Sequence, residues 1–301
     1  MVQAALGETA SSGRRGLAGP VLLADRGTDD AQIARRAAAD VAAHAGVSLR
    51  LVTAWEVPAM VRVTPTSGDL DVPGLYESSA RAMQQRIRDD LASHGLRVGR
   101  GYVAEGNATS VVARIAEMID ASLVVIGSRA GRGVGGHLMG MLPEAFVRQV
   151  HRPMLVVRGR SADWPPRSIL IVDSETGDDA AVADEGAALA RVLGVPITLL
   201  RVVPPRRAIG FDERNEPSLE STRLELRRRG ARLEAASGAE VDSWVTTGDL
   251  AGVLLGLASD PRVLVCVGRR TPPHRAGRLV SALLHQAAGP VLVVPERSHG
   301  G

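Results

Sequence analysis

The stretch "GPVLLADRGTDDAQIARRAAADVAAHAGVSLRLVTAW", Gly19–Trp55, decides the fold, because the chain contains a second version of it. That version, "RSILIVDSETGDDAAVADEGAALARVLGVPITLLRVV", spans Arg167–Val203. Each copy begins with a short apolar run, reaches Asp25 or Asp173, passes "DDA" into an Ala-rich helical stretch and ends in another apolar run. Strand, helix and strand, written twice, predict a duplicated domain.

The similarity continues toward the end of each copy. "VAEGNATSVVARIAEMIDASLVVIG" matches "VTTGDLAGVLLGLASDPRVLVCVG", which aligns Gly106 with Gly248 and Gly127 with Gly268. The closing segments "HRPMLVVRGR" and "AGPVLVVPER" also match. A repeat of roughly 140 residues is too long for a solenoid and indicates a duplication of a whole domain.

The predicted domain limits follow from this duplication and from composition. We expect a disordered leader at residues 1–18, domains at 19–160 and 168–297, a linker at 161–167 that contains Pro165 and Pro166, and a tail at 298–301. The leader is rich in Ala, Gly and Ser and lacks the apolar core of a secretory signal. No apolar run approaches the roughly 18 residues that span a membrane. The expectation is a cytoplasmic protein without a membrane partner.

Composition excludes several kinds of chemistry. The chain of 301 residues has no lysine, so all 36 basic side chains are Arg. A P-loop and a Schiff-base enzyme both need a Lys. Aromatic residues make up 2%, too few for the stacking surface of a nucleic-acid binder, so no nucleic-acid partner is expected. Cys266 stands alone in an apolar run and is read as a buried hydrophobe, and the His residues show no metal-ligand spacing.

The apolar runs of the first copy predict a parallel sheet. They are continuous rather than alternating, as in strands that are buried on both faces. Helical patterns lie between them, so the elements alternate and predict a doubly wound α/β fold in each copy, with ligands at the carboxyl ends of the strands. The predicted strands are Val21–Ala24, Ser48–Ala54, Leu96–Ala104, Leu123–Ile126 and Met154–Val157.

These residues together resemble the universal stress protein family in its tandem form. The resemblance rests on an Asp that closes the first strand, a Gly before the third helix, a glycine loop after the fourth strand and a final "P-x-L-V-V" strand. It implies two Rossmann-like domains of the adenine nucleotide alpha hydrolase-like type, each a five-stranded parallel sheet with helices on both faces. It also implies that the final strands pair antiparallel, here as a pseudo-dimer within one chain, with a homodimer of chains as a further assembly.

One subgroup of the family binds ATP through a G-x2-G-x9-G-(S/T) loop. In the first half this motif corresponds to Gly127, Ala130, Gly140 and Met141, so the spacing is kept while the second Gly and the terminal Ser/Thr are replaced. The same count in the second half gives Gly268, Thr271, Ser281 and Ala282, which keeps only the first glycine.

The first loop retains the physical properties of a phosphate cradle. Its backbone N–H groups and the following helix N-terminus favour an anion, and Arg129 and Arg132 add charged donors. The family resemblance implies ATP or another adenine nucleotide, with Mg²⁺, as the ligand of the first half, and a mobile surface loop without ligand is the alternative. The candidate binding residues are Asp25, Val103, Gly106, Gly127, Ser128, Arg129, Ala130, Gly131, Arg132, Gly140 and Met141.

The second loop, "GRRTPPHRAGRLVSA", is a poorer cradle. Pro272 and Pro273 remove two N–H donors and restrict the backbone. Its arginines still attract anions, but a solvated basic loop is the favoured interpretation.

Asp25 and Asp173 have two interpretations. A carboxylate at a strand end can accept a hydrogen bond from a base or ribose, and in the family the corresponding Asp lies near adenine. Alternatively, each caps the turn into its helix. Val103 and Gly106 resemble the strand end that contacts the base in the family, and packing explains such small residues equally well.

No nucleophile elbow or paired acid indicates a catalytic site. The leading prediction is a nucleotide-binding stress-response regulator rather than an enzyme. A nucleotide-free scaffold that acts through its surfaces and a slow nucleotide hydrolase are the alternatives.

Overall fold

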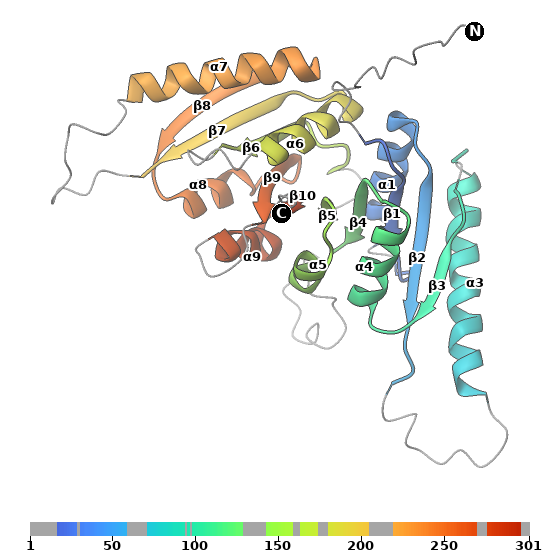
Figure 1. Ribbon diagram of the computed structural model, residues 1–301. Coiled ribbons are helices and arrows are strands. Elements are labelled where there is room, and N and C mark those ends of the chain that lie inside the picture. The colour runs from blue at the N-terminus through green and yellow to red at the C-terminus, as the bar shows by residue number, and fades with distance from the viewer. Residues whose placement is uncertain are drawn as a thin grey trace, which may run out of the picture.

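The computed structural model describes residues 17–28, 31–58, 71–93, 95–96, 98–128, 143–158, 163–173, 180–204, 219–269 and 276–295. Within these ranges the two halves repeat one order of strands and helices (Figure 1). The first half contains β1 (Val21–Ala24), α1 (Gln32–Ala45), β2 (Leu49–Trp55), α3 (Val72–Ser93), β3 (Tyr102–Glu105), α4 (Ala108–Met118), β4 (Leu123–Gly127), α5 (Pro143–Gln149) and β5 (Met154–Val157). The second contains β6 (Ser168–Val172), α6 (Ala180–Leu193), β7 (Ile197–Val203), α7 (Leu219–Ser237), β8 (Val241–Thr247), α8 (Leu250–Leu257), β9 (Val263–Arg269), α9 (Ala276–Gln286) and β10 (Val291–Pro295).

The strands form a single sheet in the order β3-β2-β1-β4-β5-β10-β9-β6-β7-β8. Within each half all strand pairs are parallel, which confirms the predicted five-stranded parallel sheets. In Figure 1 the pair β3 and α3 lies at one outer end of the molecule, and β8 and α7 lie at the other. The two halves therefore meet through their last strands.

The junction between the halves is the antiparallel pair β5–β10. Leu155 lies opposite Leu292, and Met154 lies opposite Val293. All four side chains are buried, so the edge that each half exposes alone is covered by the other half. This pairing confirms the predicted pseudo-dimer within one chain.

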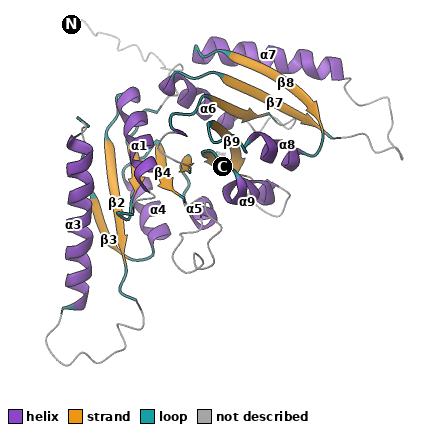
Figure 2. Cartoon of the chain, turned by 180° about the vertical axis from the view of Figure 1, so that it is seen from behind, coloured by secondary structure: helices purple, strands orange, loops and turns teal. Residues whose placement is uncertain are grey.

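Two apolar clusters cover the two faces of this sheet. One joins the strands to α1, α3, α6 and α7, and the other joins them to α4, α5, α8 and α9. Successive strand residues alternate between the clusters: Leu23 belongs to the first and Leu22 to the second. Helices are visible on both faces in the front and rear views (Figures 1 and 2). Each cluster continues through the junction, so the halves share their cores.

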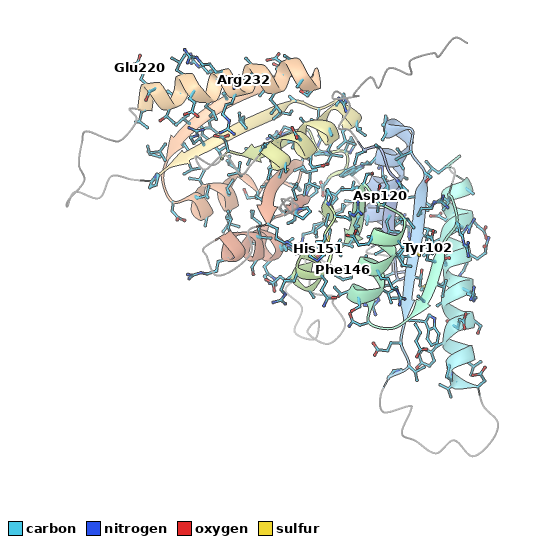
Figure 3. The ribbon with its side chains drawn as sticks, viewed as in Figure 1. Tyr102, Asp120, Phe146, His151, Glu220 and Arg232 are labelled. Carbon is cyan, nitrogen blue, oxygen red and sulfur yellow. The ribbon has the colours of Figure 1, made fainter. Side chains whose placement is uncertain are left out.

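Side chains near the junction reinforce this packing. Figure 3 shows Phe146 and His151 where the first half meets the second. The Phe146 ring is completely buried in the cluster of α4, α5, α8 and α9. On the opposite face lies Trp164, between β5 and β6 in the chain, whose buried indole N–H donates to Asp40 Oδ2 of α1 at 2.9 Å.

The sequence prediction was wrong for the third strand. We expected Leu96–Ala104, but β3 is Tyr102–Glu105, and Val98 forms only an isolated bridge with Leu49. Gly99 and Gly101 explain the difference, because glycine weakens a strand and permits close approach of other groups. A Cβ on Gly101 would meet the Gln84 side chain of α3 at 2.3 Å.

The second strand is displaced by one residue, to Leu49–Trp55, while β1 and β5 have their predicted limits. Cys266 is buried in β9, as expected.

Candidate functional site

The site begins where the strand order reverses. From β1 the chain continues to β2 on one side, while β4 lies on the other side of β1. In open parallel sheets a crevice for ligands forms at this point, beyond the carboxyl ends of the strands. Asp25 follows β1, and Gly127 ends β4.

The strand register places the candidate residues in one row. Ala24 lies opposite both Val52 and Ile126, so the next residues, Asp25 and Gly127, are neighbours at the carboxyl edge. In the same row Thr53 lies opposite Val103. Because adjacent strands are about 4.8 Å apart, Val103 is about 10 Å from Asp25, with Thr53 between them. The structure thus brings Asp25 and Gly127 together and places Val103 further along the edge.

The Asp25 carboxylate is buried and already hydrogen-bonded. It accepts from the Gly27 backbone N–H at 2.8 Å, from Arg35 Nε at 2.5 Å and from Arg35 Nη2 at 3.3 Å. The bond from the Gly27 N–H agrees with the predicted alternative, in which Asp25 caps the turn that leads into the helix, although the N-cap residue of α1 itself is Ala31. Asp25 also pairs with Arg35 in α1.

Thr53 stabilises the strand ends next to Asp25. Its hydroxyl donates to the Asp25 carbonyl oxygen at 3.2 Å and accepts from Gln84 Nε2 at 3.4 Å. Gln84 also donates to the Tyr102 carbonyl oxygen at 2.9 Å, which ties α3 to the end of β3. Neutral hydrogen bonds therefore tie α3 to β2 and β3, and β2 to the end of β1, beside the charged pair of Asp25 and Arg35.

Gly106 shapes the turn after β3. Its φ of 130° is accessible almost only to glycine, and its N–H donates to the Trp55 carbonyl oxygen at 2.9 Å. The next residue, Asn107, caps α4 by accepting from the Thr109 N–H at 3.0 Å. The backbone conformation alone accounts for the glycine, so its contact with a ligand stays a prediction.

Of the glycine loop, the structure describes Gly127 and Ser128. Gly127 is exposed at the end of β4, and the Ser128 N–H donates to the Val157 carbonyl oxygen at 2.9 Å. Arg129, Ala130, Gly131, Arg132, Gly140 and Met141 lie outside the described residues.

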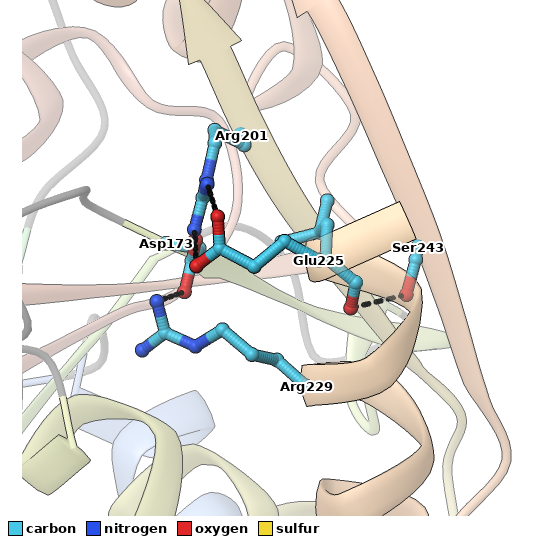
Figure 4. A network of polar contacts seen from close by, with 6 residues as sticks. Asp173, Arg201, Glu225, Arg229 and Ser243 are labelled. Carbon is cyan, nitrogen blue, oxygen red and sulfur yellow. Dashed lines mark hydrogen bonds and ion pairs between the residues drawn. The ribbon is translucent and has the colours of Figure 1, made fainter. Parts of the chain in front are cut away.

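The second half has a charged network in the corresponding row (Figure 4). Val172 lies opposite Leu200, so Arg201 takes the position that Thr53 has in the first half. Arg201 donates to Asp173 Oδ2 from Nε at 2.7 Å and from Nη2 at 2.5 Å, and to Glu225 Oε2 from Nη1 at 3.0 Å. Arg229 Nη1 lies 2.7 Å from Asp173 Oδ1. Two guanidinium groups and two carboxylates thus fill this strand edge.

Burial and the neighbouring carboxylates shift the pKa of Arg201 in opposite directions. Burial alone would lower the pKa of Arg201, but its hydrogen bonds to Glu225 and Asp173 outweigh that effect and raise the pKa. The hydrogen bond from Arg201 to Glu225 in turn lowers the pKa of the Glu225 carboxyl. Both groups are therefore held in their charged forms.

The sequence interpretation missed Arg35, Thr53, Arg201 and Arg229. Arg201 had a signal: it is a charged residue inside the apolar run "ITLLRVV" and aligns with Thr53 in the duplication. Arg35 and Arg229 had none, because their contacts depend on how α1 and α7 pack.

The structure corrects the loop alignment of the second half. Ser281 and Ala282 lie inside α9 and are not loop residues. The paired strand residues Gly127 and Val157 are thirty positions apart, whereas Gly268 and Val294 are twenty-six apart. A count without a gap therefore passed beyond the shorter loop and into the helix.

Ser281 takes part in a contact between the halves. Its hydroxyl donates to Glu144 Oε1 of α5, and His285 Nε2 lies 3.1 Å from the same oxygen. The hydrogen bond from Ser281, with a smaller contribution from the charge of His285, holds the pKa of the Glu144 carboxyl below its usual value.

We expect this contact to make stability depend on pH. Because the Glu144 pKa is lower in the folded state, its stabilisation is present above the unfolded value of 4.5 and is lost as the pH falls through the folded pKa. The carboxylate is partly exposed, so the effect should stay below about 1 kcal/mol. Urea unfolding from pH 7 to pH 3 checks this. The Glu144→Gln variant should lose less stability on acidification than the parent, and equal losses would contradict the assignment.

Neither a membrane span nor a metal cluster is found in the part of the chain that the structure describes. No helix there is long and apolar enough to cross a bilayer, and no group of three or more His, Cys, Asp or Glu side chains gathers as metal ligands.

Comparison with known proteins agrees with this architecture. The model of the universal stress protein family matches twice, at residues 18–158 and 166–295. A universal stress protein from Archaeoglobus fulgidus has a similar structure, with 13% identity and a TM-score of 0.65 over 92% of this chain and 96% of that chain. A functionally unknown protein from Pseudomonas aeruginosa shows 14% identity and a TM-score of 0.57 over 92% of both chains.

A universal stress protein in complex with cAMP matches 46% of this chain and 97% of its own, at 19% identity and a TM-score of 0.37. Among curated proteins no match is found.

Proposed function

Because the chain belongs to the universal stress protein family, we propose that it is a stress-response regulator that binds ATP or another adenine nucleotide in its first half. The observation that carries the proposal is the row at the strand-order reversal, where Asp25 adjoins Gly127. The first domain, residues 19–160, is the binding unit, the second domain is residues 168–297, and the cytoplasm is the expected compartment.

The residues present fit the base and ribose of such a ligand. A carboxylate has about four acceptor positions, and the described residues donate to Asp25 three times, so acceptor capacity remains for an amino or hydroxyl group. Gly127 has no side chain at the neighbouring strand end, which leaves room for a ligand close to the backbone. Mg²⁺ would be held mainly by the phosphates of the ligand and by water.

The second half supports the proposal by contrast. Asp173 accepts from Arg201 twice and pairs with Arg229, and Arg201 replaces the small Thr53 of the first half. We propose that these guanidinium groups leave no room for a base beside Asp173, so the chain takes one nucleotide rather than two.

A binding role is favoured over catalysis. The polar groups in the row bond to one another in pairs that hold strands and helices, and no nucleophile–base pair occurs among the described residues of the row. Slow hydrolysis and a nucleotide-free scaffold are the competing proposals. Turnover that depends on Asp25 would support the first, and an unchanged melting temperature with nucleotide would support the second.

A thermal shift with matched variants tests the proposal. We expect millimolar Mg-ATP to raise the melting temperature, because a ligand that binds only the folded state stabilises it by mass action. Asp25→Ala should weaken adenosine binding about 10-fold or more, because it removes a hydrogen bond to a charged group. The variant should therefore show a smaller rise in melting temperature with Mg-ATP. Asp173→Ala is the matched control in the second half and should keep the full shift. Equal loss in both variants would contradict the assignment to the first half.

A further inference from the structure

Arg158 is a buried cation that the proposed base site does not use. It follows β5, and only 5% of the residue's surface is exposed to solvent. Nη2 donates to Ser128 Oγ at 3.2 Å, and Nη1 donates to the Ala287 carbonyl oxygen at 3.4 Å. Nε has no partner, and among the described residues it is the only buried side-chain nitrogen or oxygen in that state.

The charge of Arg158 is also uncompensated. Its two hydrogen bonds go to neutral oxygens, and neither an Asp nor a Glu of the described ranges forms an ion pair with it. Burial without a charged partner lowers the pKa of the guanidinium, yet arginine remains protonated in proteins. A buried cation of this kind is strongly stabilised by an anion.

Capping of a helix end does not account for this arrangement. Arg269, at the end of β9, performs that role on the other side of the junction. It donates to three carbonyl oxygens at the end of α5, those of Val147, Arg148 and Val150. Arg158 reaches one carbonyl oxygen at the end of α9, at a long distance, and keeps Nε free.

The position of Arg158 places it beside the candidate site. Gly127 lies opposite Val157, so Ser128 and Arg158 are the next residues at the carboxyl edge of β4 and β5. Arg158 is two strand spacings, about 10 Å, from Asp25, and Ser128 follows the strand between them, so one extended nucleotide can bridge the distance. In the second half Gly268 lies opposite Val294, and the next residue is Pro295, which has no charge.

We propose that Arg158 and Ser128 form an anion subsite for the phosphate groups of the ligand in the first half. The guanidinium supplies the charge and the free Nε–H, and the Ser128 hydroxyl supplies a second donor once it turns toward the anion. This inference rests on the proposed function for the identity of the ligand. The chemistry that it requires is a phosphate group, from a nucleotide or from free polyphosphate.

Calorimetry on the full chain with Mg-ATP, adenosine and tripolyphosphate tests the subsite. We expect Arg158→Gln to weaken the binding of ATP and of tripolyphosphate about 10-fold to 100-fold. The affinity for adenosine should change less than about twofold. Arg158→Lys keeps the positive charge and should lose less affinity for ATP and tripolyphosphate than Arg158→Gln. Arg269→Gln is the matched control, because it weakens the same junction without touching the subsite, and it should leave all three affinities unchanged.

The outcomes separate the two proposals. Equal losses for ATP and adenosine in Arg158→Gln, or no loss at all, would overturn the subsite while the base site stands. Tripolyphosphate binding that depends on Arg158, without any adenosine binding, would keep the subsite and refute the adenine site. If Arg158→Gln does not fold, the wild-type chain decides: tripolyphosphate should displace ATP but not adenosine, and failure to displace ATP overturns the subsite.

Discussion

Replacing Arg201 by Met should lower the free energy of unfolding by about 3 kcal/mol. Removal of one partner from a buried ion pair costs about 3–5 kcal/mol, and the lower end applies because Arg229 still reaches Asp173. Asp173 nevertheless loses two hydrogen bonds, and Glu225 loses its partner. Urea unfolding at pH 7, followed by circular dichroism, measures the difference.

The control for this variant is Arg223→Met on α7. Arg223 is exposed on the same helix as Arg229, and surface substitutions of this kind usually change stability by less than about 0.5 kcal/mol. A loss below about 1 kcal/mol in Arg201→Met would show that the network in Figure 4 does not stabilise the second half.

Replacing Leu155 by Ala at the junction should cost about 2–5 kcal/mol. Leu155 is fully buried between the two halves, and a large-to-small change there removes apolar contacts and leaves a cavity. Because the apolar cluster that contains Leu155 also contains residues of the second half, both halves should lose stability together. Chemical denaturation with Trp fluorescence and circular dichroism as separate probes measures this.

Two further variants sharpen the junction experiment. Leu75→Ala, at an exposed position of α3, should be nearly neutral. Leu155→Ala combined with Leu292→Ala should cost less than the two single changes together, since the two residues lie opposite each other and share one cavity. Strict additivity, or unfolding of the first half alone, would contradict a shared core.

Much of the architecture was predictable because apolar runs and duplication are strong signals. The limits of β1 and β5 were correct, since each is a short apolar run that the sheet buries on both faces. The antiparallel pairing of β5 with β10 followed from the family resemblance. The third strand was misplaced because Gly99 and Gly101 interrupt a run that looks continuous by composition.

The site was predictable only in part. The position of Asp25 at a strand end was correct, but its partner Arg35 depends on the packing of α1, which no spacing reveals. Ser281 was misassigned because the second loop is shorter, and only strand pairing shows this. Arg158 drew no attention in the sequence, because its burial and its free Nε depend on the junction between the halves.

The number of nucleotides bound per chain tests the central claim most directly. Under the proposed function, equilibrium dialysis of the full chain against Mg-ATP should show one saturable site, because Asp25 adjoins Gly127 in the first half while Arg201 and Arg229 bond to Asp173 in the second. Asp25→Ala should weaken that site, and Asp173→Ala should leave it intact. No binding at millimolar Mg-ATP, or two equivalent sites per chain, would contradict the account.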